Sequence, residues 1–436
     1  MTIVAETLAQ TIRAAGIKTV FGLPGGENAE LLDAMRREGL EFILTRNESS
    51  AVFMADATAR LTGKPGVTLT TLGPGTANAF CGIAHAFLDR APVLLLTAQS
   101  DSRLLGKHTH QVIDLQASLK PVTKMTRELT NVRTRQVVKE ALRLTMDGRP
   151  GPVHLGISSF MAGQEVVEES VETTRKVKAK KGSPPNITAA GAFLANAKRP
   201  VIIAGLGLEP EKPYEAIRQL AEAAQAPVIV TPKAKGALAD DHPLSAGTLG
   251  LTQSDPAYEI VDESDCIVAI GFDVVELVRV WDHEQPLIWV AAWSNDDPKL
   301  PTVKHEFVGA IRPILEQLAQ VDYDPHPAWG ESRVATFCNR HGQSKLPVPA
   351  AGRLWPQTVL GSLRRYVPRQ AVVTTDVGSH KIFAALTWPT YTPNSYLLSN
   401  GLSAMGMGLP AAIAAAKVTR QTVICITGDG GMAMVI

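Results

Sequence analysis

Apolar, β-branched runs recur along this chain, and most of them end in a glycine turn or a polar turn. In the first region such runs cover residues 18–22, 41–44, 67–71 and 92–97. Helix-like stretches lie between them, at 2–15, 29–38, 49–61 and 76–88. The same alternation resumes in the middle of the chain and near its end. Strands that alternate with helices form parallel sheets with helices on both faces, so the sequence predicts an α/β protein.

Polar stretches interrupt this alternation and divide the chain. Residues 166–186 change from acidic to basic and end in paired prolines, and residues 323–350 are polar and rich in proline. Low hydrophobicity and proline are typical of exposed connectors. We therefore expect consecutive doubly wound parallel-sheet domains at 1–165, 187–322 and 351–436, with 166–186 and 323–350 as linkers.

Composition excludes several classes of protein. Hydrophobic residues make up 45% of the 436, and 43 basic against 42 acidic residues give a net charge of only +1, which leaves no basic footprint for a nucleic acid. No apolar run reaches the ~20 residues that span a bilayer, and the first residues do not read as a signal peptide. Four scattered cysteines lack metal-ligand spacing and suit a reducing cytosol. We expect a cytoplasmic protein without nucleic-acid or membrane partners.

The last apolar run, 422–427, ends in Gly428-Asp429-Gly430-Gly431. Asp429 is expected at the carboxyl end of a buried strand, where open α/β sheets place their ligands. Mg²⁺ commonly takes one or two protein carboxylates together with phosphate oxygens. The alternative is an ordinary tight turn in which Asp is a turn former.

Glu48 follows the predicted strand 41–44 and opens the next helix. One interpretation is a carboxylate that is favoured at a helix start by the helix dipole. The other is a partly buried carboxylate that is directed at the nitrogen of a heteroaromatic ring and acts as a general acid or base.

Several motifs occur in order and together carry a resemblance. They are Phe21 to Gly26 (FGLPGG), Arg46 to Glu48 (RNE), Ala55 to Arg60 (ADATAR), Gly63 to Gly66 (GKPG) and Gly73 to Asn78 (GPGTAN). This set resembles the pyrimidine-binding domain of thiamine-diphosphate enzymes, and most closely the acetolactate synthase large-subunit group. The chain departs from that pattern at Asn47, where His is usual, and at Ala57-Thr58, where Gly-Tyr is usual.

The resemblance implies roles for residues of the first domain. Glu48 and Gln111 would be catalytic, and Pro24, Gly25, Gly73 and Asn78 would bind thiamine diphosphate. His108 and His110, in the same loop as Gln111, are either acid/base groups or solvated loop residues. The stretch 149–155 resembles the strand that closes this domain, a structural role.

The last region resembles the family's diphosphate-binding domain in three stretches, which begin near Asp376, Ser399 and Gly428. The resemblance implies that the cofactor is held by Val377, Gly378, Ser379, His380, Ser403, Met405, Gly428, Asp429, Gly430 and Gly431. Met405 is either a core residue or the apolar side chain that bends the cofactor. Asp429 would be the Mg²⁺ ligand. The family's motif continues to an Asn that supplies a second ligand, so we expect this domain to be incomplete within the 436 residues.

The central region carries Gly205-Leu206-Gly207, but Pro210 stands where a dinucleotide fingerprint has its third glycine. In the resembled family this domain binds FAD in some members and nothing in others. The FAD-binding members show an Arg-Phe-Asp-Asp-like segment, whereas this chain has Phe272-Asp273 without the arginine. The sequence favours a domain without FAD, with FAD as the alternative.

The resemblance implies an enzyme that decarboxylates a 2-oxo acid and joins the product to a second carbonyl, as acetolactate synthase does. The cofactors would be thiamine diphosphate and Mg²⁺, in a homodimer or homotetramer with active sites at the subunit interface. The alternatives are a lyase of the same family that decarboxylates without carboligation, and a truncated homologue without catalytic activity.

Overall fold

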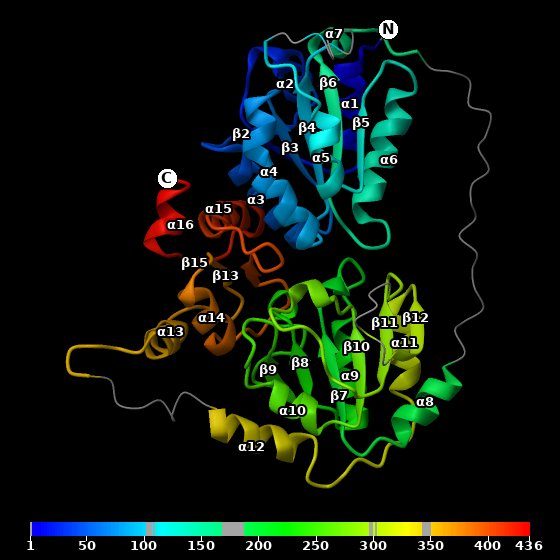
Figure 1. The fold of residues 1–436 in the computed structure, drawn as a ribbon, viewed down its shortest axis with the longest axis vertical. Helices are drawn as coiled ribbons and strands as arrows, with labels where there is room; N and C mark the ends of the chain where they lie inside the picture. Colours follow the sequence, from blue (N-terminus) through cyan, green and yellow to red (C-terminus); the bar gives the residue numbers. More distant parts are fainter. Residues whose placement is uncertain are drawn as a thin grey trace. The chain divides into compact units, whose positions relative to one another are not determined.

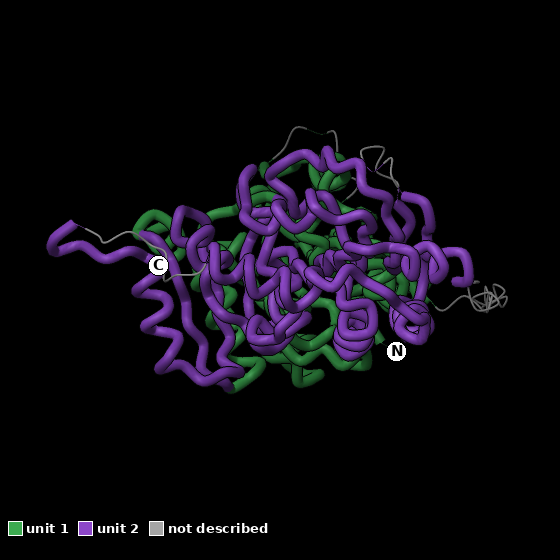
Figure 2. The backbone as a smooth tube through the Cα atoms, turned by 90° about the horizontal axis from the view of Figure 1, so that it is seen from below, with its two compact units in different colours: residues 1–181, 402–420, 429–436 green, residues 182–401, 421–428 purple. Residues whose placement is uncertain are grey.

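The computed structural model describes residues 2–101, 107, 110–167, 187–295, 300, 303–341 and 350–436. The chain forms two compact units, shown in Figure 2: residues 1–181, 402–420 and 429–436 make up the first, and 182–401 with 421–428 the second. Most of the predicted linker 166–186 lies outside the described residues. Among the helices described, none combines the length and apolar character needed to cross a membrane.

The first unit is built on a parallel sheet of six strands in the order β2-β1-β3-β4-β6-β5 (Figure 1). The strands are β1 (Thr19–Gly22), β2 (Glu41–Leu44), β3 (Gly66–Thr70), β4 (Val93–Gln99), β5 (Met125–Glu128) and β6 (Val153–Ser158). The helices of residues 2–167 are α1 (Val4–Ala14), α2 (Ala29–Arg37), α3 (Glu48–Thr62), α4 (Pro74–Leu88), α5 (Leu115–Leu119), α6 (Thr134–Met146) and α7 (Ser159–Ala162).

Alternation along the strands decides which helices cover each face. Leu69 of β3 and Leu94 of β4 pack with α1, α2 and α6 in one apolar cluster. Thr68 points the other way, because successive side chains of a strand alternate, and its hydroxyl donates to the carbonyl of Ala51 in α3 at 3.4 Å. Helices therefore cover both faces of this sheet, as the sequence predicted.

Two further helices belong to the first unit, α15 (Gly408–Thr419) and α16 (Asp429–Ala433). The side chains that α15 buries are small, among them Ala411, Ala414 and Ala415. Small side chains let α15 pack closely against α3, and Lys417 pairs with Glu41 at 2.7 Å.

The second unit contains two parallel sheets, with strand orders β12-β11-β10-β7-β8-β9 and β14-β13-β15. The strands are β7 (Pro200–Ala204), β8 (Val228–Val230), β9 (Ser245–Thr248), β10 (Cys266–Ile270), β11 (Leu287–Ala291), β12 (Val303–Val308), β13 (Val372–Thr375), β14 (Tyr396–Leu398) and β15 (Val423–Ile426). The helices are α8 (Thr188–Ala195), α9 (Tyr214–Ala224), α10 (Tyr258–Glu263), α11 (Ile311–Leu318), α12 (Glu331–His341), α13 (Pro356–Arg364) and α14 (Ser379–Thr387). The described residues therefore form three parallel sheets with helices, which confirms the predicted fold class.

The larger sheet has an apolar core on each face. Ile202 and Val268 pack with α8, α9 and α11, whereas Val201 and Ile267 pack with α10 and α12. Nearly uninterrupted apolar strands such as β10, with every residue buried, are typical of parallel sheets covered on both sides.

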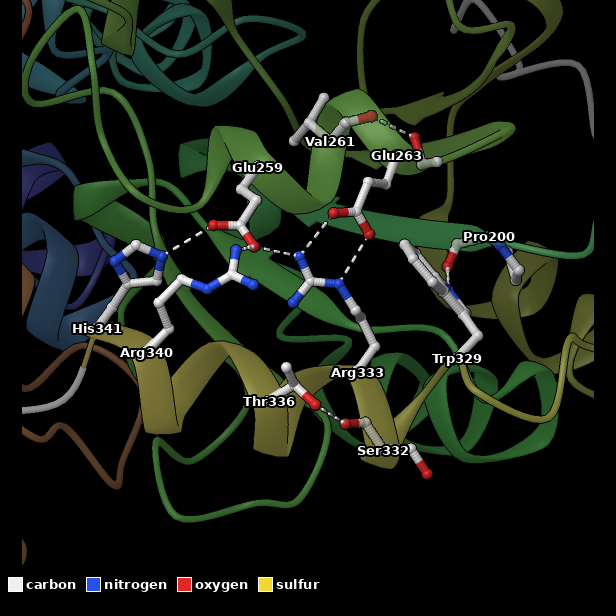
Figure 3. A network of polar contacts seen from close by, with 11 residues as sticks. Pro200, Glu259, Val261, Glu263, Trp329, Ser332, Arg333, Thr336, Arg340 and His341 are labelled. Carbon is white, nitrogen blue, oxygen red and sulfur yellow. Dashed lines mark hydrogen bonds and ion pairs between the residues drawn. The ribbon is translucent and has the colours of Figure 1, made fainter.

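Charged side chains fasten α12 to α10 (Figure 3). The guanidinium of Arg333 binds the carboxylates of Glu259 and Glu263 at 2.5 and 2.8 Å, and Arg340 and His341 bind Glu259 at 2.5 and 2.9 Å. The hydrogen bond from His341, followed by those from the arginines, lowers the pKa of Glu259 to about 2. Glu259 and Glu263 lie one turn apart on α10, so Arg333, which is mostly buried, cross-links two successive turns of that helix.

Candidate functional site

The position of Glu48 follows from the start of α3. The side chain of Asn47 caps this helix by accepting a hydrogen bond from the backbone N–H of Ser49 at 2.8 Å. Glu48 is therefore the first helical residue, and it is only 6% exposed. The residue at position 47, where the sequence departs from its resembled family, thus has a local structural role.

The carboxylate of Glu48 lies against the first turn of α4. A Cβ atom added at Gly75 would stand 3.3 Å from Oε1 of Glu48 and 2.4 Å from Oγ1 of Thr71. A side chain at position 75 would therefore displace both groups. Glycine at position 75 therefore lets the carboxylate of Glu48 and the hydroxyl of Thr71 lie against the backbone of this turn.

Gln111 lies close to Gly73, at the start of the Gly73–Gly75 turn. Gly73 has φ +52°, in the left-handed region that favours glycine, and a Cβ atom added there would stand 3.5 Å from Cβ of Gln111. The structure therefore brings the two predicted catalytic residues, Glu48 and Gln111, to the Gly73–Gly75 turn. His110 is exposed, and His108 lies outside the described residues.

Gly25 and Asn78 lie near this turn as well. The methyl group of Thr71 is 2.3 Å from a Cβ placed at Gly25, and the N–H of Gly25 donates to Oδ1 of Asn28 at 2.9 Å. Ser49 donates to the carbonyl of Asn78 at 2.5 Å, and Pro24 and Asn78 are exposed. Thr71 thus contacts both glycine turns, although the sequence placed it inside a strand and gave it no role.

A buried charge cluster fixes α3 against α4 behind this site. Both ring nitrogens of His85 contact carboxylates, Nε2 at 2.9 Å from Asp56 and Nδ1 at 2.6 Å from Asp89, and all three side chains are fully buried. Arg60 adds a bond to Asp56 at 2.7 Å and donates to the backbone carbonyl of Asp89 at 2.6 Å. Burial by itself would lower the pKa of His85, but the two carboxylates outweigh it and raise that pKa. Ionised carboxylates only accept hydrogen bonds, so contacts at both ring nitrogens favour the imidazolium form of His85, a residue to which the sequence assigned no role.

The second unit carries the predicted diphosphate residues that follow β13. Strands β13 and β15 pair in parallel, Thr375 with Ile426, so the turns after them begin at one sheet edge. A Cβ at Gly378 would stand 2.7 Å from the ring of His380, and one at Gly428 3.2 Å from it. The ring thus lies between two glycines, and its Nε2 is buried without a hydrogen-bond partner among the described residues. Val377 and Ser379 complete this turn, and Ser379 begins α14.

The first unit carries the residues that follow, from Asp429. The predicted turn 428–431 is wrong in its second part, because α16 begins at Asp429. Oδ1 of Asp429 accepts a hydrogen bond from the N–H of Gly430 at 2.9 Å, and the residue is exposed, so the carboxylate has further acceptor capacity. Gly431 is buried.

Met405 is not a core residue, so that alternative is wrong: its side chain is 40% exposed. Its terminal methyl lies 3.3 Å from the Cβ position of Gly430. Ser403, at φ +53°, and Gly406, at φ +86°, bend the chain on either side of Met405. The exposed side chain of Met405 therefore lies beside Gly430, the residue that follows Asp429.

Comparison with known proteins gives consistent matches along the chain. Residues 2–118 match the N-terminal TPP-binding domain of thiamine pyrophosphate enzymes, residues 187–318 the central domain, and residues 376–436 the C-terminal TPP-binding domain.

Individual relatives agree. The chain is 32% identical to a probable acetolactate synthase large subunit of Methanocaldococcus jannaschii, over 99% of this chain and 76% of the relative. It is 31% identical to the acetolactate synthase isozyme 3 large subunit of Escherichia coli, over 99% of this chain and 78% of the relative. An acetolactate synthase of Bacillus subtilis is 31% identical, over 98% of this chain and 76% of its own length. The chain therefore belongs to the thiamine pyrophosphate enzyme family, close to the acetolactate synthases.

Proposed function

We propose that this protein decarboxylates a 2-oxo acid with thiamine diphosphate and Mg²⁺ and joins the product to a second carbonyl, as acetolactate synthases do. The proposal rests above all on one observation, the buried carboxylate of Glu48 against a turn that only glycine fits. When bound, the cofactor supplies the carbon nucleophile and the electron sink. This chain supplies binding, orientation and a proton-transfer group.

The residues around Glu48 suit the pyrimidine end of such a cofactor. A positioned carboxylate can exchange a proton with a ring nitrogen in general acid or base catalysis. Gly25, Gly73 and Gly75 let Thr71, Gln111 and Glu48 lie against the backbone, and Pro24 and Asn78, which are exposed, would border the ring. Gln111, at the same turn, would hydrogen-bond the carboxylate or carbonyl of the 2-oxo acid.

Two sets of residues suit the diphosphate end, those around His380 in the second unit and those from Asp429 onward in the first. The orphaned Nε2 of His380 is a group that a phosphate oxygen would satisfy, and Gly378 and Gly428 let the His380 ring lie against the main chain of both turns. Val377, Ser379, Gly430 and Gly431 would contribute backbone N–H groups. Asp429 would hold Mg²⁺, which takes few protein carboxylates when phosphates fill other positions. Met405 would press on the cofactor and fix its bend, and Ser403 would position that residue.

We further propose that the Glu48 end and the Asp429 end of one cofactor are held by two different chains of a homodimer or homotetramer. In that assembly the interface would form the active site. We also propose the boundaries 1–165, 187–322 and 351–436 for the domains, and a cytoplasmic location. Helix α12 lies inside the predicted linker 323–350, but it packs on the central domain.

Product analysis tests the proposal. With pyruvate, thiamine diphosphate and Mg²⁺, we expect CO₂ and acetolactate, detected by NMR spectroscopy of the reaction mixture. If acetaldehyde forms and acetolactate does not, the activity is simple decarboxylation without carboligation. If neither product forms from pyruvate or from other 2-oxo acids, while the protein is folded and saturated with both cofactors, the proposed function is wrong.

A further inference from the structure

The central sheet has one place at which a nucleotide would be expected. Strand β7 lies between β8 and β10, so the chain leaves β7 toward one side and later returns on its other side. Open α/β sheets bind ligands at such a switch point, beyond the carboxyl ends of the strands. The residues there are the turns after β7 and β10, at Gly205–Gly207 and at Gly271.

These two turns pack on each other. The N–H of Gly207 donates to the carbonyl of Gly271 at 2.8 Å, and a Cβ at Gly205 would meet Cα of Phe272 at 2.6 Å. The indole of Trp293 lies 2.3 Å from the Cβ position of Gly207. The glycines therefore serve close contact between parts of the protein, and no space is left between them for a diphosphate.

An internal carboxylate occupies the anion position at this edge. Glu276 is 1% exposed, and its Oε2 accepts hydrogen bonds from the N–H of Leu206 at 2.9 Å and from the hydroxyl of Thr231 at 2.7 Å. Its Oε1 accepts one from the N–H of Lys233 at 3.3 Å. Burial raises the pKa of Glu276 to about 7, and these donors oppose that rise. Donors from turns that follow two neighbouring strands are the groups a bound phosphate would use.

A second buried carboxylate, that of Asp255, accepts backbone hydrogen bonds in the turn after β9. Asp255, 2% exposed, accepts hydrogen bonds from the N–H groups of Gly250, Leu251 and Thr252 at 2.7 to 3.0 Å. Asp273 is buried beside Glu276 in sequence. Several buried carboxylates along this edge would repel the charges of a nucleotide diphosphate.

We infer that Glu276 takes the place of a ligand phosphate in the central domain, so that this domain binds no FAD or other nucleotide and is instead closed by its own side chain. The closed edge has a different task. The backbone carbonyl of Glu276 accepts a hydrogen bond from the side chain of Asn400 at 2.7 Å, and Lys233 donates to the carbonyl of Leu398 at 2.8 Å. The edge thus holds the end of β14 and the residues after it, which lead toward Met405.

Flavin retention tests the inference without any variant and independently of catalytic activity. The purified full chain is incubated with excess FAD, desalted and examined by absorbance at 450 nm. We expect no bound flavin, and stoichiometric FAD on the wild-type protein would overturn the inference.

Removal of the carboxylate gives the second arm. Glu276→Ala leaves its donors free for a small external anion, so we expect it to bind inorganic phosphate at least about tenfold more tightly than the wild type in isothermal titration calorimetry. Glu276→Gln, which keeps the side chain in place, is expected to match the wild type. If Glu276→Ala folds, by circular dichroism, and gains no affinity, Glu276 is not a phosphate substitute. If it does not fold, the flavin measurement still decides.

Discussion

Glu48→Gln is expected to lower the rate of pyruvate turnover by roughly 10²- to 10⁴-fold, the usual contribution of a positioned general acid or base. Glutamine has nearly the same shape, so the contact with Gly75 and the helix start at Asn47 remain. The loss then reports the missing proton transfer. The measurement is steady-state CO₂ release at saturating thiamine diphosphate and Mg²⁺.

Glu30→Gln is the matched control, because Glu30 lies on α2 and is exposed. It is expected to leave the rate unchanged. Thermal unfolding of both variants should stay close to that of the wild type. A Glu48→Gln enzyme with undiminished turnover would remove Glu48 from the chemistry while leaving the fold as described.

His85→Leu is expected to destabilise the protein by about 3 to 5 kcal/mol near neutral pH, the usual cost of breaking a buried ion pair. The substitution removes the ring that contacts the buried carboxylates of Asp56 and Asp89, while Arg60 still contacts Asp56 and the backbone carbonyl of Asp89. Since α3 and α4 also hold Glu48 and Gly75, activity should fall as well. Urea unfolding of wild type and variant measures the difference.

His154 supplies a control of the same residue type. It is buried, but hydroxyl groups of Thr97 and Thr126 bind its ring nitrogens at 2.8 and 2.7 Å, and no carboxylate of the described residues is bonded to the ring. Burial lowers the pKa of His154 to about 3, so this ring is neutral. His154→Gln removes no charge, and we expect a smaller cost, about 1 to 2 kcal/mol.

The two histidines predict opposite pH dependences. The folded-state pKa of His85 is raised above 6.5, so its stabilising contribution is complete below pH 6.5 and is lost as pH rises through the raised value. For His154 the folded-state pKa is depressed, so its contribution is present above pH 6.5 and is lost as pH falls toward 3. If the free energy gap between wild type and His85→Leu widens with rising pH, the cluster is not held by an imidazolium.

The fold could be predicted largely because buried parallel strands have a plain sequence signal. Strands β1 and β2 fall where the apolar runs 18–22 and 41–44 do. Strand β9 was not predicted because its residues, Ser-Ala-Gly-Thr, form no β-branched run. Strand β12 was not predicted because half-buried and exposed residues alternate along it at the edge of its sheet. Edge strands and short strands are specified by their neighbours more than by their own composition.

Motif residues of the candidate site could be predicted because their order along the chain carries the resemblance. Residues that act through contacts between distant segments could not. His85 reads as one polar residue on an apolar helix, and only the packing of α3 on α4 shows its two carboxylate partners. Likewise, Gly205 and Gly207 resemble part of a nucleotide motif, and only the structure shows Glu276 and Trp293 against that turn.

The central claim is that residues of two chains hold the two ends of one cofactor. Mixing Glu48→Gln with Asp429→Ala, each inactive alone, tests it by subunit exchange. Random reassociation of a dimer should place both intact residues in about a quarter of the sites and restore about that share of wild-type pyruvate turnover. A folded, exchanged mixture that stays as inactive as its two components would contradict the account.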